Sequence, residues 1–174
     1  AYRRALLSHA PRFKAVLELA AAQADWDRPL PSNWGRGIAI QHAFGTIVAE
    51  VVEVEFTDGK IRVDRIVCAA DAGYVMHPDG FAAQMEGGII YGLTAALHGE
   101  ITIADGAVAQ SNFHDYPALR LAESPRIEVH VINSGETVGG GGEPSTPPVA
   151  PALANAIYQA TGQRLRQLPL RLPG

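Results

Sequence analysis

The sequence predicts an α+β fold in which a mixed or antiparallel sheet with hairpins packs against two or three helices. Apolar and charged residues alternate within Thr46 to Phe56, a period of two that is typical of a strand. Asp58-Gly59 follows directly, and this dipeptide is a strong signal for a hairpin turn. The run from Phe81 to Leu97 is nearly all apolar and predicts a central, buried helix.

The composition is that of an ordinary globular chain. Hydrophobic residues make up 47% of the 174 residues, which excludes an intrinsically disordered protein. No stretch reaches the roughly 18 uninterrupted apolar residues of a membrane-spanning helix. The formal net charge of -4 argues against a basic surface for nucleic acid. Cys68 is the single cysteine, which excludes an internal disulfide and a cysteine-based zinc or iron–sulfur site in this chain.

The N-terminal part is predicted to be helical from Tyr2 to Ala24, with Pro11 beginning the main helix. Asp25 to Asn33 is rich in turn-forming residues and predicts a linker. We therefore divide the chain into residues 1–34, a helix and linker, and residues 35–174, which contain the other elements. The chain has no initiator methionine, so we expect it to be a piece of a longer protein.

Three strands are predicted next, at Arg36 to His42, Thr46 to Phe56 and Ile61 to Ala69. The third strand ends in the run Ile66 to Ala70, which is apolar on both faces and indicates burial on both sides of the sheet. Asp71 directly follows this strand and is a candidate turn cap.

The apolar helix contains Gly87, Gly88 and Gly92. A glycine inside a helix costs about 1 kcal/mol relative to alanine. We expect close packing against another backbone to offset this cost.

The remaining elements are predicted from shorter signals. They are a hairpin of Glu100 to Ile103 with Val108 to Gln110, an irregular segment Ser111 to Ala122, a strand Ile127 to Ile132, a loop Gly135 to Pro148, a helix Val149 to Thr161 capped by Gly162, and an extended segment Arg164 to Leu170.

The loop Gly139 to Pro148 has the composition of a ligand-binding segment. Its four consecutive glycines let the backbone approach a ligand closely, and the prolines that follow stiffen the exit. Glu143 lies between these two parts, just before a helix N-terminus. The helix dipole favours its ionised form while burial would raise its pKa, and the sequence leaves both open. The alternative is a flexible surface loop with an incidental glutamate. The Walker pattern and the dinucleotide fingerprint are both absent.

Other polar residues allow two interpretations each. Gln84 and Glu86 near the start of the apolar helix either cap or bridge neighbouring loops, or Gln84 hydrogen-bonds a polar cofactor. The group His114-Asp115-Tyr116 is predicted to anchor a polar part of the core. The histidines lack short-spaced partners, so no side-chain metal site is predicted.

Two motifs together resemble a known family. Gln84-Met85-Glu86-Gly87 and the loop Gly139 to Pro148 are similar to segments of the molybdenum-binding subunit of the xanthine dehydrogenase/aldehyde oxidase family, especially the branch that contains the isoquinoline 1-oxidoreductase beta subunits. The resemblance extends over the runs Val67 to Thr102, Ser111 to Ile132 and Val138 to Leu170. It places the chain at the C-terminal end of that subunit, with residues 35–174 as the last part of its cofactor-binding domain.

The resemblance implies an oxidoreductase that hydroxylates an N-heteroaromatic or aldehyde substrate with oxygen from water. Glu143 matches the family's general base, and Gln84 matches the glutamine that hydrogen-bonds the pterin cofactor. Gly141 and Gly142 match loop positions whose backbone approaches the metal ligands. The implied cofactor is molybdopterin with molybdenum, in its cytosine dinucleotide form.

The same resemblance implies partners outside this chain. They are the remainder of the large subunit and an iron–sulfur small subunit that carries [2Fe-2S]. We expect the isolated chain to bind no molybdenum and to have no turnover, and exposure of the apolar helix would favour a homo-oligomer. Cytoplasm and periplasm both stay open as the compartment. Two further hypotheses are a non-catalytic module of the same family, whose glycine loop is a subunit contact, and an unrelated glycine-loop nucleotide binder.

Overall fold

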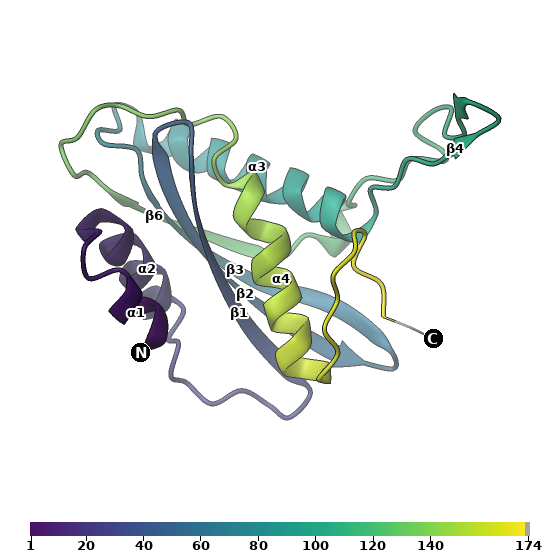
Figure 1. Cartoon of the computed structure of the whole chain (residues 1–174), viewed down its shortest axis with the longest axis horizontal. Coiled ribbons are helices and arrows are strands. Elements are labelled where there is room, and N and C mark those ends of the chain that lie inside the picture. The colour runs from purple at the N-terminus through teal and green to yellow at the C-terminus, as the bar shows by residue number, and fades with distance from the viewer. Residues whose placement is uncertain (173–174) are drawn as a thin grey trace.

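The computed structural model describes residues 1–172 and has a four-stranded sheet between two layers of helices (Figure 1). The strands are β1 (Trp34–Ala43), β2 (Thr46–Thr57), β3 (Lys60–Asp71) and β6 (Arg126–Ile132), in the order β1-β2-β3-β6. The first three are antiparallel, whereas β6 runs parallel to β3. The predicted α+β class with a mixed sheet is confirmed.

Two tight turns join the antiparallel strands. Asp58 and Gly59 have φ values of 52° and 74°, and Phe44 and Gly45 have φ values of 56° and 80°. Positive φ at both central residues matches the right-handed twist of the flanking strands. The predicted hairpin at Asp58-Gly59 is therefore confirmed, and the turn at Phe44-Gly45 is of the same kind.

The parallel pairing of β3 with β6 needs a crossover, which helix α3 (Pro78–Leu97) provides. Both faces of the end of β3 are covered, because Ile66, Cys68 and Ala70 pack on the side of α3 while Val67 and Ala69 pack on the opposite side, against the N-terminal helical segment, as the apolar run predicts. Helix α3 begins at Pro78 and not at Phe81, because the imidazole of His77 accepts the N–H of Gly80 and caps the first turn.

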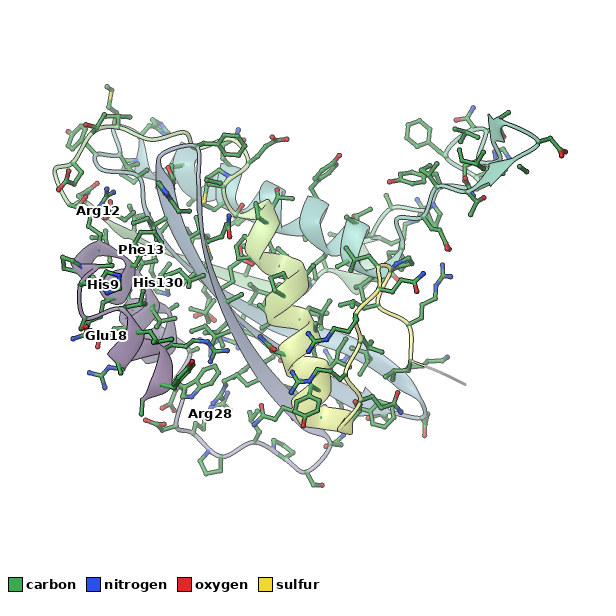
Figure 2. The ribbon with its side chains drawn as sticks, in the orientation of Figure 1. His9, Arg12, Phe13, Glu18, Arg28 and His130 are labelled. Atoms are coloured by element: carbon green, nitrogen blue, oxygen red, sulfur yellow. The ribbon has the colours of Figure 1, made fainter. Side chains whose placement is uncertain are left out.

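Helix α2 (Pro11–Gln23) covers one face of the sheet, and the short helix α1 (Tyr2–Leu6) packs against α2. Arg12 and Phe13 project from α2, on the side of the sheet away from α4 (Figure 2). The apolar residues that meet at this face are Val16, Leu17, Ala20, Ala24, Ile38, Ile47, Ala49, Val51, Val67 and Ala69. Arg12 Nε also donates a hydrogen bond of 2.8 Å to the buried carboxylate of Asp71 at the end of β3.

Helices α3 and α4 (Thr146–Thr161) cover the opposite face. Helix α4 begins at Thr146, so the predicted start at Val149 is wrong by one turn. Pro147 and Pro148 lie in this first turn, where a missing N–H costs no intrahelical hydrogen bond. Met85, Ile89 and Leu93 of α3 are fully buried within the chain, so no oligomer is needed to cover them. No helix among residues 1–172 is long and apolar enough to cross a membrane.

Of the three glycines that the sequence analysis singles out in α3, two have the close packing that it predicts. A Cβ on Gly92 would come within 2.8 Å of Val149 Cγ2 and 2.9 Å of the backbone oxygen of Thr146, and a Cβ on Gly88 would overlap the hydroxyl of Ser145. A Cβ on Gly87 would meet nothing within 4 Å. Close approach of α4 therefore explains Gly88 and Gly92 but not Gly87.

An arm between α3 and β6 extends away from the body (Figure 1). It holds the two-residue strands β4 (Ile103–Ala104) and β5 (Ala107–Val108) and a 3-10 turn at Leu121–Glu123. His114 lies on this arm with its side chain 73% exposed, so its predicted role in a polar core anchor is wrong. Asp115 instead accepts hydrogen bonds from the backbone N–H groups of Ser111 and Asn112.

Glu50 lies in the middle of β2, opposite Ala39 of β1 and Cys68 of β3. Its side chain is fully buried, and neither carboxyl oxygen has a hydrogen-bond partner among residues 1–172. Burial raises the pKa of Glu50 well above its ordinary value, because an unpaired charge is unfavourable in an apolar core. Burial is also the main cause that raises the pKa of the Cys68 thiol, and the nearby carboxylate of Glu50 raises it further. The predicted packed thiol is confirmed, since Cys68 is a free and buried cysteine.

The glycines of α3 give a matched pair of substitutions. Gly87→Ala should stabilise the chain by up to about 1 kcal/mol, because it removes the helix penalty of glycine into open space. Gly92→Ala should destabilise it by about 1–3 kcal/mol, because the added methyl group overpacks the contact with α4. Urea unfolding of both variants measures these free energies, and equal effects would contradict the packing account.

The buried Glu50 predicts a distinct pH dependence of stability. The pKa of Glu50 is raised in the folded state. Its contribution to the free energy of unfolding is therefore fully present below the unfolded pKa of about 4.3 and is lost as pH rises through the folded pKa. Glu50→Gln should reduce this loss, so that its stability relative to the wild type increases with pH.

Urea unfolding between pH 4 and pH 9 would measure the effect. Glu86→Gln is the matched control, because Glu86 is an exposed carboxylate on α3. A wild-type pH dependence that Glu50→Gln leaves unchanged would contradict this assignment.

Candidate functional site

A small pocket lies between α3 and the N-terminal end of α4. Its volume is about 150 Å³. The lining residues are Gln84, Gly87, Gly88, Tyr91, Gly142, Glu143 and Thr146. Helix α3 therefore supplies one wall, and the end of the glycine loop with the first turn of α4 supplies the other.

The glycine loop reaches this pocket along a path fixed by its backbone. The N–H of Gly139 donates to the backbone oxygen of Ala72 at 2.9 Å, and the N–H of Gly140 donates to that of Phe44 at 2.7 Å. These two acceptors lie at the end of β3 and in the β1–β2 turn. The loop thus crosses one end of the sheet before it enters α4.

Asp71 supports the segments on which the loop rests. Its carboxylate accepts hydrogen bonds from the N–H of Gly73 and the hydroxyl of Ser134, both at Oδ1, while Arg12 binds Oδ2. Burial alone would raise the pKa of Asp71, but these hydrogen bonds and the charge of Arg12 outweigh it and lower the pKa. The predicted turn cap at Asp71 is confirmed, and it also joins β3 to the segment after β6.

The far end of the loop carries Glu143 at the entrance to α4. Its backbone oxygen accepts the N–H of Thr146 at 3.0 Å, and its side chain is exposed. The N–H groups of Gly141, Gly142 and Glu143 have no acceptor among residues 1–172. Three adjacent free donors beside a pocket can bind an anionic or carbonyl-like ligand atom.

The structure brings together three of the four residues that the sequence singles out. Glu143, Gln84 and Gly142 line one pocket, although Gln84 and Glu143 are 59 positions apart. Gly141 lies outside the lining, where a Cβ would come within 3.1 Å of the ring of Phe81.

The surroundings of Gln84 and Glu86 contradict one of the two interpretations that the sequence allows for them. Both side chains are exposed, and neither makes a hydrogen bond within the described part of the chain. The interpretation in which they cap or bridge neighbouring loops is therefore wrong. An exposed amide at Gln84 has both a donor and an acceptor free for a ligand.

Two lining residues were missed by sequence reasoning. Tyr91 lies seven positions after Gln84, so both fall on one face of α3, and helical periodicity was the signal that could have found it. Thr146 falls within the predicted loop, because the prolines after it are unfavourable inside a helix. No group of three or more His, Cys, Asp or Glu side chains that could hold a metal ion occurs among the described residues.

Comparison with known proteins identifies the family. The sequence model of the molybdopterin cofactor-binding domain matches residues 12–125. Since this match covers more than half of the chain, the chain belongs to the molybdopterin cofactor-binding domain family. The resemblance found in the sequence is confirmed.

Particular relatives refine this assignment. The chain is 40% identical to the beta subunit of the isoquinoline 1-oxidoreductase from Brevundimonas diminuta, over 98% of this chain and 22% of that protein. It is 32% identical to a subunit of the nicotinate dehydrogenase from Pseudomonas putida, over 92% of this chain and 15% of that protein. The chain thus spans less than a quarter of the length of these relatives.

A solved structure supports the fold. The crystal structure of the aldehyde oxidoreductase from Desulfovibrio desulfuricans superposes with a TM-score of 0.61 and 29% sequence identity. The match covers 72% of this chain and 14% of that protein. The sheet and its helices therefore form part of a fold found in a much larger enzyme.

Proposed function

We propose that this chain is a segment of the large subunit of a molybdenum hydroxylase, where it supplies the general base Glu143 and part of the cofactor pocket. The observation that carries the proposal is the convergence of Glu143, Gln84 and the free amides of the glycine loop on one pocket. Residues 35–174 would form the C-terminal part of the cofactor-binding domain, and residues 1–34 would lead into it.

The residues present fit a pterin cofactor. A pterin ring carries several hydrogen-bond donors and acceptors, which the exposed amide of Gln84 can match. The unpaired N–H groups of Gly142 and Glu143 can donate to an electron-rich ligand atom. A Cβ on Gly142 would meet nothing within 4 Å, so a ligand can approach this backbone closely. When bound, the cofactor supplies two-electron redox chemistry at molybdenum. The cytosine dinucleotide form is the one we propose.

The size of the pocket indicates that other parts of the protein complete the site. Its volume of about 150 Å³ is well below the roughly 300–1,000 Å³ of ordinary ligand pockets. This chain therefore forms one wall, and the remainder of the large subunit forms the others. The same reasoning supports our expectation that the chain alone holds no molybdenum and has no turnover.

Glu143 is suited to accept a proton. Its carboxylate is exposed at the pocket and forms no ion pair among residues 1–172, so it is free to receive a proton from a bound group. Its backbone lies just before the first turn of α4, which begins at Thr146 and gives this end of the loop a rigid support. A general base needs hydrogen-bond reach to the proton it removes and a rigid support.

The relatives suggest the substrate class and the partners. Isoquinoline and nicotinate, named in two of them, are N-heteroaromatic, so we propose an N-heteroaromatic substrate, with an aldehyde as the second choice. Their designations as subunits support assembly with further subunits, among which we propose a small subunit with [2Fe-2S].

Replacement of the base tests this proposal. In the complete enzyme that carries this chain, Glu143→Gln should lower kcat by about 10²–10⁴-fold, because the amide cannot accept the proton. Molybdenum content should stay unchanged, because the substitution keeps the shape of the side chain. Steady-state kinetics and metal analysis of the same preparation measure both.

Glu86→Gln is the matched control, since Glu86 is an exposed carboxylate on α3 that does not line the pocket. It should leave kcat within about twofold of the wild type. A loss of less than tenfold in the Glu143→Gln enzyme would favour the non-catalytic module. Binding of a nucleotide by the chain alone would favour the hypothesis that the chain is an unrelated glycine-loop nucleotide-binding protein.

A further inference from the structure

We propose that the hydroxyl groups of Thr46 and Ser145 form a two-point clamp that positions Glu143 relative to Gln84. This inference rests on the proposed function, since it concerns the geometry of the same base. Neither hydroxyl lines the pocket, so both are positioning residues that act through the backbone.

Ser145 fixes the end of the loop to the helix that carries Gln84. Its side chain is fully buried, and its Oγ donates to the backbone oxygen of Met85 at 2.9 Å. Met85 directly follows Gln84, and Ser145 lies two residues after Glu143. The bond therefore ties the backbone of the base to the backbone of the proposed cofactor ligand.

The surface of α3 is shaped to receive this hydroxyl. A Cβ on Gly88 would overlap Ser145 Oγ, so only glycine leaves room for it. Thr146 adds a second bond of the same type, from its Oγ1 to the backbone oxygen of Gly88 at 3.1 Å. Both acceptors are helix carbonyls that can accept a second hydrogen bond beside the intrahelical one.

Thr46 fixes the beginning of the loop to the sheet. Its side chain is also fully buried, and its Oγ1 donates to the backbone oxygen of Gly140 at 2.6 Å. The N–H of the same glycine donates to Phe44 at 2.7 Å, so Gly140 is held on both sides of its backbone by the β1–β2 turn. Thr46 begins β2, which gives the contact a rigid base.

Only the short segment Gly141 to Pro144 lies between the two fixed points. The N–H groups of its first three residues have no acceptor among residues 1–172. Without the clamp, glycines at 141 and 142 would allow this backbone many conformations. A displacement of about 1 Å can lower a catalysed rate by about 10²-fold. The two hydroxyls thus restrict a segment that its own sequence leaves mobile.

The test removes each hydroxyl from the complete enzyme. Thr46→Val keeps the branched shape without the donor, and Ser145→Ala removes the other donor. Each should lower kcat by about 10–100-fold while KM and molybdenum content change by less than about threefold. Hydrogen exchange at the amides of residues 139–146 should become at least about fivefold faster, because the loop opens more often.

Two comparisons make the result specific. Thr161→Val is the matched control, since Thr161 Oγ1 donates at 2.8 Å to the backbone oxygen of Ile157 at the far end of α4. It should alter neither kcat nor exchange in the loop. Thr46→Ser restores a hydroxyl and should recover most of the lost rate. Ser145→Cys keeps the volume with a weaker donor and serves if Ser145→Ala does not fold.

The outcomes separate this inference from the proposed function. If Glu143→Gln is inactive while Thr46→Val and Ser145→Ala match the control in kcat and hydrogen exchange, the clamp proposal is overturned and the proposed function stands. If Glu143→Gln keeps its activity, the proposed function fails, whatever the clamp variants do. Faster exchange together with a loss in kcat at unchanged KM supports the clamp.

Discussion

The site depends on the close approach of helix α4 to strand β1 and helix α3. Glycines remove the side chains that would prevent it: a Cβ on Gly35 or Gly37 would overlap the backbone of α4, and a Cβ on Gly92 would crowd Val149. Since α4 lies directly on both neighbours, its N-terminal turn is placed against α3. Glu143 and Gln84 then line one pocket, although most of the packing that brings them together lies outside it.

The N-terminal segment is joined to the same body by packing and by buried charge. Helix α2 forms an apolar core with one face of the sheet. The linker after it is held by Arg36, which pairs with Glu53 at 2.6 Å and donates to the backbone oxygen of Trp26. Glu53 also accepts from Arg28, so one buried carboxylate binds two arginines. Glu50 on the same strand has no such partner among residues 1–172, and burial favours its neutral form.

Much of the fold was predictable because the signals are local. Alternation located the strands, Asp58-Gly59 located the hairpin, and the glycines of α3 indicated close packing. The start of α4 was not predicted, because proline is unfavourable inside a helix but is tolerated in the first turn, where Pro147 and Pro148 lie. The hairpin of the arm was predicted and is present as β4 and β5, but the projection of the arm from the body was not, since contact with the body is a tertiary property. In the site, Glu143 and Gln84 followed from motifs, whereas Tyr91, Thr146 and the hydroxyl bonds depend on how α4 crosses α3.

We propose that the residues lining this pocket form one wall of a molybdopterin site. The most direct test is to measure molybdenum and released nucleotide in the complete large subunit that carries this chain, produced with an assured supply of cofactor. The account predicts about one molybdenum per subunit together with a pterin-linked cytosine nucleotide. A subunit that folds but contains neither metal nor pterin would contradict it, and the glycine loop would then be explained as a contact between subunits.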